Sequence, residues 1–128
     1  MATIVLIVGY AVNLALNAGL KFWVQEVRPS QNQHSFALDL SDVYVQASEL
    51  GVHEYGMPSG HSQAVWFLTT YTALAIKNNY ITALYASISI CTMIQRVKYK
   101  NHTIQQVFAG MIVGILFAYG LYRTVLII

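Results

Sequence analysis

Charged residues are scarce in this sequence. Only 9% of the 128 residues are Asp, Glu, Lys or Arg, and 56% are hydrophobic, whereas a soluble domain carries roughly 25% charged residues. Four stretches hold no charged residue at all: 1–20, 55–76, 78–95 and 101–122. A soluble helical bundle is the alternative to a membrane protein, but its helices need polar outer faces, and these stretches have little charge on any face.

Cysteine, basic runs and metal-binding motifs are also lacking. The single cysteine, Cys91, cannot form an internal disulfide, and its apolar surroundings predict that it is buried. The net charge is only +2 and no basic run is interleaved with aromatics, so no nucleic-acid partner is expected. No HExxH pattern occurs, and His34 and His53 fall in a polar connection. Neither a metal nor another cofactor is therefore expected.

Each uncharged stretch is long enough to cross a membrane as a helix, which rises roughly 1.5 Å per residue through about 30 Å of hydrocarbon. Helices also satisfy their own backbone hydrogen bonds in lipid. We therefore predict an all-α fold, a polytopic membrane bundle of about four transmembrane helices forming a single domain over 1–128. The predicted spans are about 3–22, 58–76, 80–96 and 102–122. The first span shows neither a basic start nor a cleavage site, and is interpreted as a retained helix.

The first helix is expected to continue past Lys21 toward Arg28, where a proline ends or turns it. Asn13, Asn17, Lys21 and Gln25 recur every four residues, with Arg28 three later, so they form one polar stripe on such a helix. In a membrane helix a polar stripe faces other helices or water.

The polar loop 30–57 is the only long connection. Apolar residues recur at helical spacing between Leu40 and Leu50, which predicts either a short helix on the membrane surface or one packed against the bundle. After this loop, Pro58 suits the first turn of a helix. In the last span, Gly110, Gly114 and Ala118 are spaced by four, which permits close helix contact.

Four spans place both termini on one side of the membrane. The 21–57 connection and the 96–102 loop then lie together on the other side. Lys21, Arg28, the segment 58–61, Arg96 and His102 consequently fall at one membrane face. Two arginines, a lysine and the free amides of a helix start, Ser59 and Gly60 included, are suited to an anion such as phosphate.

The two histidines add reactivity to this predicted phosphate site. A neutral imidazole can attack phosphorus, and a second, protonated one can donate to the departing oxygen. Gln106 lies four residues after His102 on the same helix face, where its carbonyl can accept from Nδ1 and fix the tautomer. The alternative is that the histidine is structural and the cations only reach to head groups. Five such residues at one face favour the phosphate site.

Three ordered motifs resemble those of the type 2 phosphatidic acid phosphatase superfamily. They are Lys21-x6-Arg28-Pro29, Pro58-Ser59-Gly60-His61 and Arg96-x5-His102. The residues around them resemble the dolichyldiphosphatase branch. They are Lys21-Phe22-x-x-Gln25-Glu26-x-Arg28-Pro29, Glu54-Tyr55-Gly56-Met57-Pro58-Ser59-x-His61-Ser62-Gln63 and His102-Thr103-x-x-Gln106-Val107.

The resemblance implies a membrane phosphatase that needs no metal. His102 would be the nucleophile that forms a phosphohistidine, and His61 the general acid. The phosphoryl oxygens would be held by Lys21, Arg28, Ser59, Gly60 and Arg96. The implied partner is a lipid-linked diphosphate, dolichyl diphosphate, in the endoplasmic-reticulum membrane, besides the membrane lipids themselves. The sequence does not indicate an oligomeric state.

Two positions depart from the wider superfamily. Gln106 stands where the wider superfamily has Asp, and the dolichyldiphosphatase-like branch also has Gln there. Gln95 stands where a serine usually precedes the arginine of the third motif. A broader lipid phosphate phosphatase and a silent lipid-phosphate-binding protein stay open as alternatives. Basic residues concentrate on the site side, which by itself indicates a cytoplasmic site, whereas the resemblance implies a luminal one.

Overall fold

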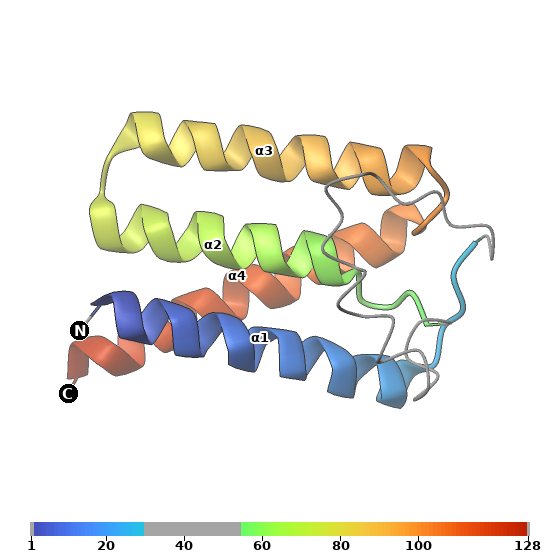
Figure 1. Ribbon diagram of the computed structural model, residues 1–128, viewed down its shortest axis with the longest axis horizontal. Coiled ribbons are helices and arrows are strands. Elements are labelled where there is room, and N and C mark those ends of the chain that lie inside the picture. The colour runs from blue at the N-terminus through green and yellow to red at the C-terminus, as the bar shows by residue number, and fades with distance from the viewer. Residues whose placement is uncertain (1, 30–54, 128) are drawn as a thin grey trace.

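Four α-helices make up most of the chain that the computed structural model describes, residues 2–29 and 55–127 (Figure 1). They are α1 (Ala2–Val24), α2 (Gly60–Ile76), α3 (Asn79–Lys98) and α4 (Ile104–Ile127). The predicted all-helical fold is confirmed for this part of the chain. The helix expected between Leu40 and Leu50 lies outside the described residues.

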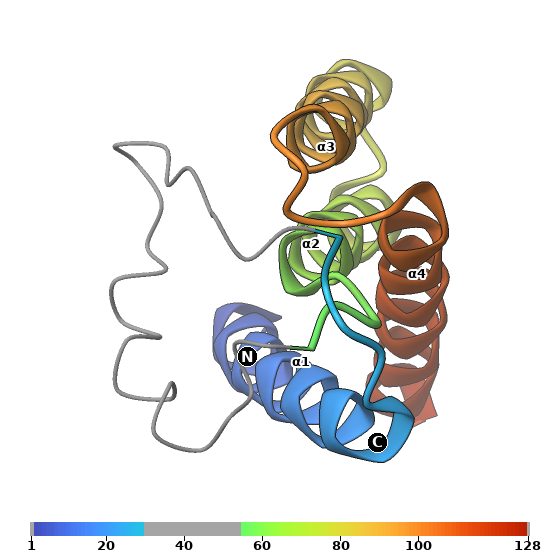
Figure 2. The same cartoon turned by 90° about the vertical axis from the view of Figure 1, so that its right-hand side faces the viewer.

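The four helices run side by side, and α2 is central. It packs against α1, α3 and α4 (Figure 2). Both chain termini lie at one end of the bundle, while the end of α1, the start of α2, the end of α3 and the start of α4 meet at the other (Figure 1). The alternating directions inferred from the sequence therefore hold for the helices, and they bring the three motifs to one end.

The polarity of the bundle is the reverse of a soluble protein. Among the described residues, thirteen polar or charged side chains are buried against six hydrophobic ones. On α3, Ser89 is 1% exposed while Ile94 is 61% exposed. Buried polar groups and exposed apolar surface are the informative exceptions to the usual distribution. They are typical of helices whose outer surface meets lipid instead of water.

Two helices are long and apolar enough to cross a membrane, over Thr3–Val24 and Ile104–Leu126. The other two differ from them in ways that the sequence explains. α2 has only 17 residues and carries several buried polar side chains, such as Gln63 and Thr69, which suits its central position. α3 ends with Arg96 and Lys98.

The expected continuation of the first helix toward Arg28 is wrong. The helix ends at Val24, and Gln25 adopts a left-handed conformation, φ 54°. Its N–H donates to the carbonyl of Lys21 at 2.9 Å, as at many helix C-termini. The proline after Arg28 also disfavours helical backbone there. The chain instead turns back, and Val27 forms an isolated antiparallel bridge with Tyr55.

The predicted polar stripe survives only within α1. Asn13, Asn17 and Lys21 are buried, whereas Gln25 is exposed. Gln63 of α2 donates through Nε2 to the carbonyl and to Oδ1 of Asn13, both at 2.9 Å, and accepts from Asn17 Nδ2 at 2.9 Å. The stripe therefore joins α1 to α2, as its position in a membrane helix predicts.

The remaining boundaries shift by a few residues from those expected. The second helix begins at Gly60 with Ser59 as its N-cap, and ends before Lys77, which is left-handed. Asn78 caps α3 by accepting from the two amides that follow Asn79. α4 begins at Ile104, two residues after the expected start. Because side-chain caps end the repeating hydrogen bonds, periodicity alone does not locate them.

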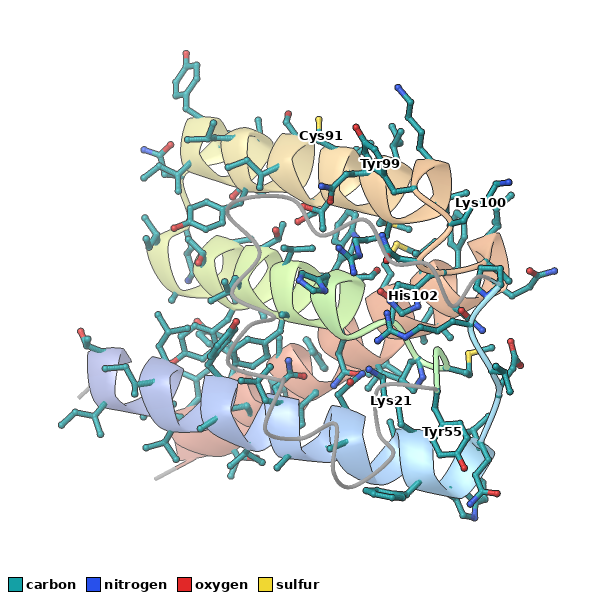
Figure 3. The ribbon with its side chains drawn as sticks, turned by 45° about the vertical axis from the view of Figure 1, so that its right-hand side comes forward. Lys21, Tyr55, Cys91, Tyr99, Lys100 and His102 are labelled. Carbon is teal, nitrogen blue, oxygen red and sulfur yellow. The ribbon has the colours of Figure 1, made fainter. Side chains whose placement is uncertain are left out.

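Helix α4 packs on α2 through its small residues, as predicted. A Cβ placed on Gly110 would lie 2.4 Å from the carbonyl oxygen of Ser59, and one on Gly114 would lie 2.3 Å from that of Gln63. The two backbones are therefore in direct contact. The expected burial of Cys91 is wrong, since it is exposed on the outer side of α3 (Figure 3).

Candidate functional site

The cationic residues of the three motifs meet at the end of the bundle away from the termini. Lys21, in the last turn of α1, is 7% exposed, and Arg96, in the last turn of α3, is 4% exposed. Arg28 is half-buried in the segment that follows α1. Figure 3 shows Lys21 and His102 at this same end. The structure thus brings together cations that the sequence separates by up to 75 positions.

The start of α2 faces these cations. A Cβ placed on Gly60 would lie 3.0 Å from Asn17 Oδ1 and 3.7 Å from Lys21 Nζ, so the absence of a side chain leaves the lysine close to the helix backbone. The first amides of a helix have no acceptor within it and attract anions. His61 follows in the first turn and is half-buried.

The backbone amide of Ser59, expected to bind phosphate, is already used. It donates to the carbonyl of Gln106 at 3.0 Å, because α2 and α4 begin side by side. The Oγ of Ser59 accepts from the amide of Ser62 at 3.4 Å as the N-cap. Only the hydroxyl hydrogen of Ser59 is left for a ligand, so its expected amide contribution is corrected.

His102 is tied to the end of α3 by the backbone. The carbonyl of Arg96 accepts from the amides of Asn101 at 3.0 Å and of His102 at 3.2 Å. Lys100, which lies between Arg96 and Asn101 in the sequence, is left-handed at φ 57°, and this conformation lets the chain reverse within five residues. Arg96 and His102, the two residues of the third motif, are consequently held at a fixed separation, and His102 is only 2% exposed.

The Nδ1 atom of His102 faces two oxygen atoms. The carbonyl of Gly56 lies 3.0 Å from Nδ1, and Oε1 of Gln106 lies 3.3 Å from it. The predicted contact between His102 and Gln106 is thus present. The carbonyl of Gly56, which approaches at the shorter distance, is an acceptor that the helical spacing does not reveal.

The orientation of the Gln106 amide follows from its four partners. Its Oε1 also accepts from the backbone amide of Thr103 at 3.1 Å. Its Nε2 donates to Oε1 of Glu26 at 2.9 Å and to the carbonyl of Val27 at 3.0 Å. A flipped amide would point its oxygen at two acceptors, so only this orientation satisfies all four groups.

This orientation determines the tautomer of His102. Because both neighbours of Nδ1 are acceptors, Nδ1 must carry the ring proton, and Nε2 keeps its lone pair. Burial, first, and the positive charges of Arg28, Lys21 and Arg96, in that order, lower the pKa of His102 from 6.5 to about 2. His102 precedes α4 and lies outside both candidate spans. The site therefore presents a neutral imidazole nitrogen beside three cations.

Glu26 and Gly56 belong to this arrangement, although the reasoning from spacing and charge did not select them. Both stand next to the motif residues in sequence, Glu26 two positions before Arg28 and Gly56 three before Ser59. A Cβ on Gly56 would lie 2.4 Å from Gln106 Oε1, so any larger residue there would displace the Gln106 amide. The sequence signals were this adjacency and their place in the segments that resemble the dolichyldiphosphatase branch. Within the described residues, no three His, Cys, Asp or Glu side chains are placed to hold a metal ion.

Comparisons with known proteins agree on one family. The model of the PAP2 superfamily matches residues 2–127. Dolichyldiphosphatase 1 of Mus musculus is 31% identical over 91% of this chain and 50% of its own length. Lipid phosphate phosphatase gamma of Arabidopsis thaliana is 35% identical over 47% of this chain and 31% of its own length.

The chain thus spans about half the length of the first of these relatives and less of the second. No solved structure matches the chain. The family match covers nearly every residue, including all three motifs and His102. One relative is named a dolichyldiphosphatase and the other a lipid phosphate phosphatase, and the chain belongs to the PAP2 superfamily.

Proposed function

We propose that this chain hydrolyses a lipid-linked diphosphate through a phosphohistidine on His102. The observation that carries the proposal is the position of His102 Nδ1 against two hydrogen-bond acceptors. This atom is engaged with the carbonyl of Gly56 and with Gln106, which leaves the Nε2 lone pair available beside the charges of Lys21, Arg28 and Arg96. A neutral nucleophile next to cations is the arrangement that phosphoryl transfer requires.

In the first step, the lone pair of His102 Nε2 forms a bond to the terminal phosphorus. The bond from that phosphorus to the bridging oxygen breaks, and its electron pair leaves with the lipid phosphate. His61 donates a proton to that oxygen, which is general acid assistance worth roughly 10²–10⁴ in rate. The imidazole ring of His102 becomes positively charged and keeps its Nδ1 proton.

In the second step, water attacks the phosphohistidine. His61, now neutral, takes a proton from this water as the oxygen bonds to phosphorus. The N–P bond breaks and returns its electron pair to His102 Nε2. Inorganic phosphate is released, and both histidines regain their starting states. No metal or other cofactor takes part in either step.

The phosphoryl oxygens are held by Lys21, Arg28 and Arg96, by the amide of Gly60 and by the hydroxyl of Ser59. Arginine offers paired donors to phosphate oxygens, and lysine a point charge. The close approach of Lys21 to Gly60 supports a shared ligand. Burying several positive charges together costs free energy, and the binding of the negatively charged terminal phosphate offsets this cost.

We further propose that all four helices span the membrane as one phosphatase domain, and that the substrate is dolichyl diphosphate at the luminal face of the endoplasmic reticulum. The apolar outer surface of α3, with Leu84 at 60% and Ile94 at 61% exposed, supports contact with lipid. The name of the mouse relative and the presence of Gln106 support the substrate.

The substrate is tested with purified protein, without added metal, on dolichyl diphosphate, undecaprenyl diphosphate and phosphatidate. We expect phosphate release from the diphosphates, unchanged by a chelator, and an acid-labile phosphoenzyme that His102→Ala lacks. Faster release from phosphatidate would indicate a broader lipid phosphatase. No release from any lipid, with binding intact in His102→Ala, would indicate a silent binding protein.

The orientation is tested separately in sealed endoplasmic-reticulum vesicles. Lys98 is exposed at the site end of α3, so Lys98→Cys in a Cys91→Ser background provides one reactive thiol near the site. We expect protection from a membrane-impermeant thiol reagent until the vesicles are opened with detergent. Labelling of intact vesicles would place the site in the cytoplasm.

A further inference from the structure

The partner of the His102 imidazole has no charge of its own. When Nε2 attacks phosphorus, the ring becomes cationic, and a neutral amide stabilises that cation less than a carboxylate does. The hydrogen bonds continue beyond the amide, however. His102 Nδ1 lies 3.3 Å from Gln106 Oε1, and Gln106 Nε2 donates to Glu26 Oε1 at 2.9 Å. The Glu26 carboxylate is thus connected to His102 through one intervening side chain, that of Gln106.

We propose that Glu26 is a positioning residue that supplies, through Gln106, the negative charge that stabilises the His102 imidazolium. This inference rests on the proposed phosphohistidine chemistry. Glu26 does not touch the substrate in this arrangement. It orients the amide, and its charge reaches the ring by polarising the amide.

The polarisation follows from amide resonance. As the N–P bond forms and the bond to the bridging oxygen breaks, the His102 ring becomes more acidic at Nδ1 and bonds Gln106 Oε1 more strongly. Electron density in the amide moves from nitrogen to oxygen, so Nε2–H becomes a better donor to the Glu26 carboxylate. Linked hydrogen bonds strengthen one another in this way. No proton moves along the chain, because Nδ1 keeps its own.

The backbone holds Glu26 in place for this role. Its carbonyl accepts from the amide of Gly56 at 2.7 Å, and the next residue, Val27, pairs with Tyr55. The same Gly56 directs its own carbonyl at His102 Nδ1, at 3.0 Å. The segment that carries Glu26 and the segment that contacts His102 are therefore held together by backbone hydrogen bonds.

The exposure of Glu26 limits the size of its effect. Its side chain is largely exposed, so water screens its charge, and a partly screened hydrogen bond to a charged group is modest. We expect Glu26→Gln to lower kcat about tenfold, because a glutamine keeps an acceptor for Gln106 Nε2 but removes the charge. KM should stay within about twofold, since the charge on the ring develops only in the transition state.

Two inhibitors separate charge stabilisation from a merely structural role. Orthovanadate adopts the five-coordinate geometry of phosphoryl transfer, whereas inorganic phosphate resembles the ground state. We expect Glu26→Gln to weaken inhibition by orthovanadate about tenfold and inhibition by phosphate by less than about twofold. Equal weakening of both would mean that Glu26 only supports the fold, and would overturn the proposal.

Exchanging the two side chains gives a second test. Gln106→Glu places a carboxylate against Glu26 and against the carbonyl of Val27, and should lower kcat by at least about 10²-fold. Glu26→Gln combined with Gln106→Glu restores a donor between the two positions and puts the carboxylate directly on His102. We expect it to recover at least about tenfold over Gln106→Glu alone, although the contact with Val27 remains unfavourable.

The matched control is Gln105→Glu, which adds the same charge at an exposed neighbouring position on α4, and it should keep wild-type kcat. A wild-type rate in Glu26→Gln, or no recovery in the double variant, would overturn the role of Glu26. An inactive wild-type protein that never forms a phosphoenzyme would instead refute the proposed function, so the two failures are distinct.

Discussion

Replacing Gly110 by alanine should damage the site without touching any reacting group. Gly110 lies in α4 where its backbone meets the start of α2, and an added Cβ would lie 2.4 Å from the carbonyl oxygen of Ser59 and 3.1 Å from the amide nitrogen of Gln63. Neither atom is part of a flexible side chain. An ordinary contact needs at least 3.4 Å, so the two helices must separate by about 1 Å, a displacement large enough to disturb catalysis.

The consequence follows from what each helix carries. α2 begins with Gly60 and His61, and α4 begins two residues after His102, so a separation moves the proposed general acid, His61, away from the proposed nucleophile, His102. A misplacement of about 1 Å can reduce a rate by about 10²-fold, and overpacking a tight contact costs about 1–3 kcal/mol of stability. We expect both effects in Gly110→Ala, measured as kcat on dolichyl diphosphate and as the melting temperature in detergent.

Gly120→Ala on the same helix is the control. Nothing lies within 4 Å of a Cβ at that position, and alanine favours a helix over glycine by roughly 0.5–1 kcal/mol. This variant should therefore keep its rate and melt at the same or a higher temperature. If Gly110→Ala were as active and as stable as Gly120→Ala, the direct backbone contact between α2 and α4 would be refuted.

Three further predictions concern charge and burial. Arg28→Gln should lower kcat/KM about 10²-fold. It should also raise the pKa of His102, because among the neighbouring charges Arg28 lowers that pKa the most. A pH–rate profile whose acid limb fails to move to higher pH would contradict this. Because the pKa of His102 is lowered in the folded state, the folded protein binds fewer protons than the unfolded protein below pH 6.5. The stability that depends on a neutral His102 is therefore fully present above pH 6.5 and declines as the pH falls toward 2. His102→Asn should lose part of this pH dependence of the melting temperature. Gln63→Leu should cost about 1–3 kcal/mol, because Asn13 Oδ1 loses its donor and Asn17 Nδ2 keeps only the carbonyl of Pro58 as an acceptor. An unchanged melting temperature would count against that network.

The helical fold was readable because charge is absent from each helix except near its C-terminal end. Uncharged stretches of nearly constant length predicted the four helices and their alternating directions, and all four are present among the described residues. The gathering of Lys21, Arg96 and His102 at one end followed from those directions alone. The errors in helix length lie at the helix ends, as at Gln25, where a left-handed residue breaks a pattern that continues in the sequence.

The identities of the hydrogen-bond partners were beyond sequence reasoning. The contact between His102 and Gln106 could be predicted, because the two residues are four positions apart in the sequence, about one helical turn. The contact between Gln106 and Glu26 joins residues 80 positions apart, and it depends on how the chain turns after α1. No local periodicity encodes such a distance.

The sequence by itself therefore determined which residues are the candidates for the site and at which end of the bundle they gather, since hydrophobic length and the order of the motifs are local properties of the chain. Only the tertiary structure decided which nitrogen of His102 is available and that Glu26 stands behind it. These depend on where the Gly56 carbonyl and the Gln106 amide point. Packing between α1, α2 and α4 sets those directions.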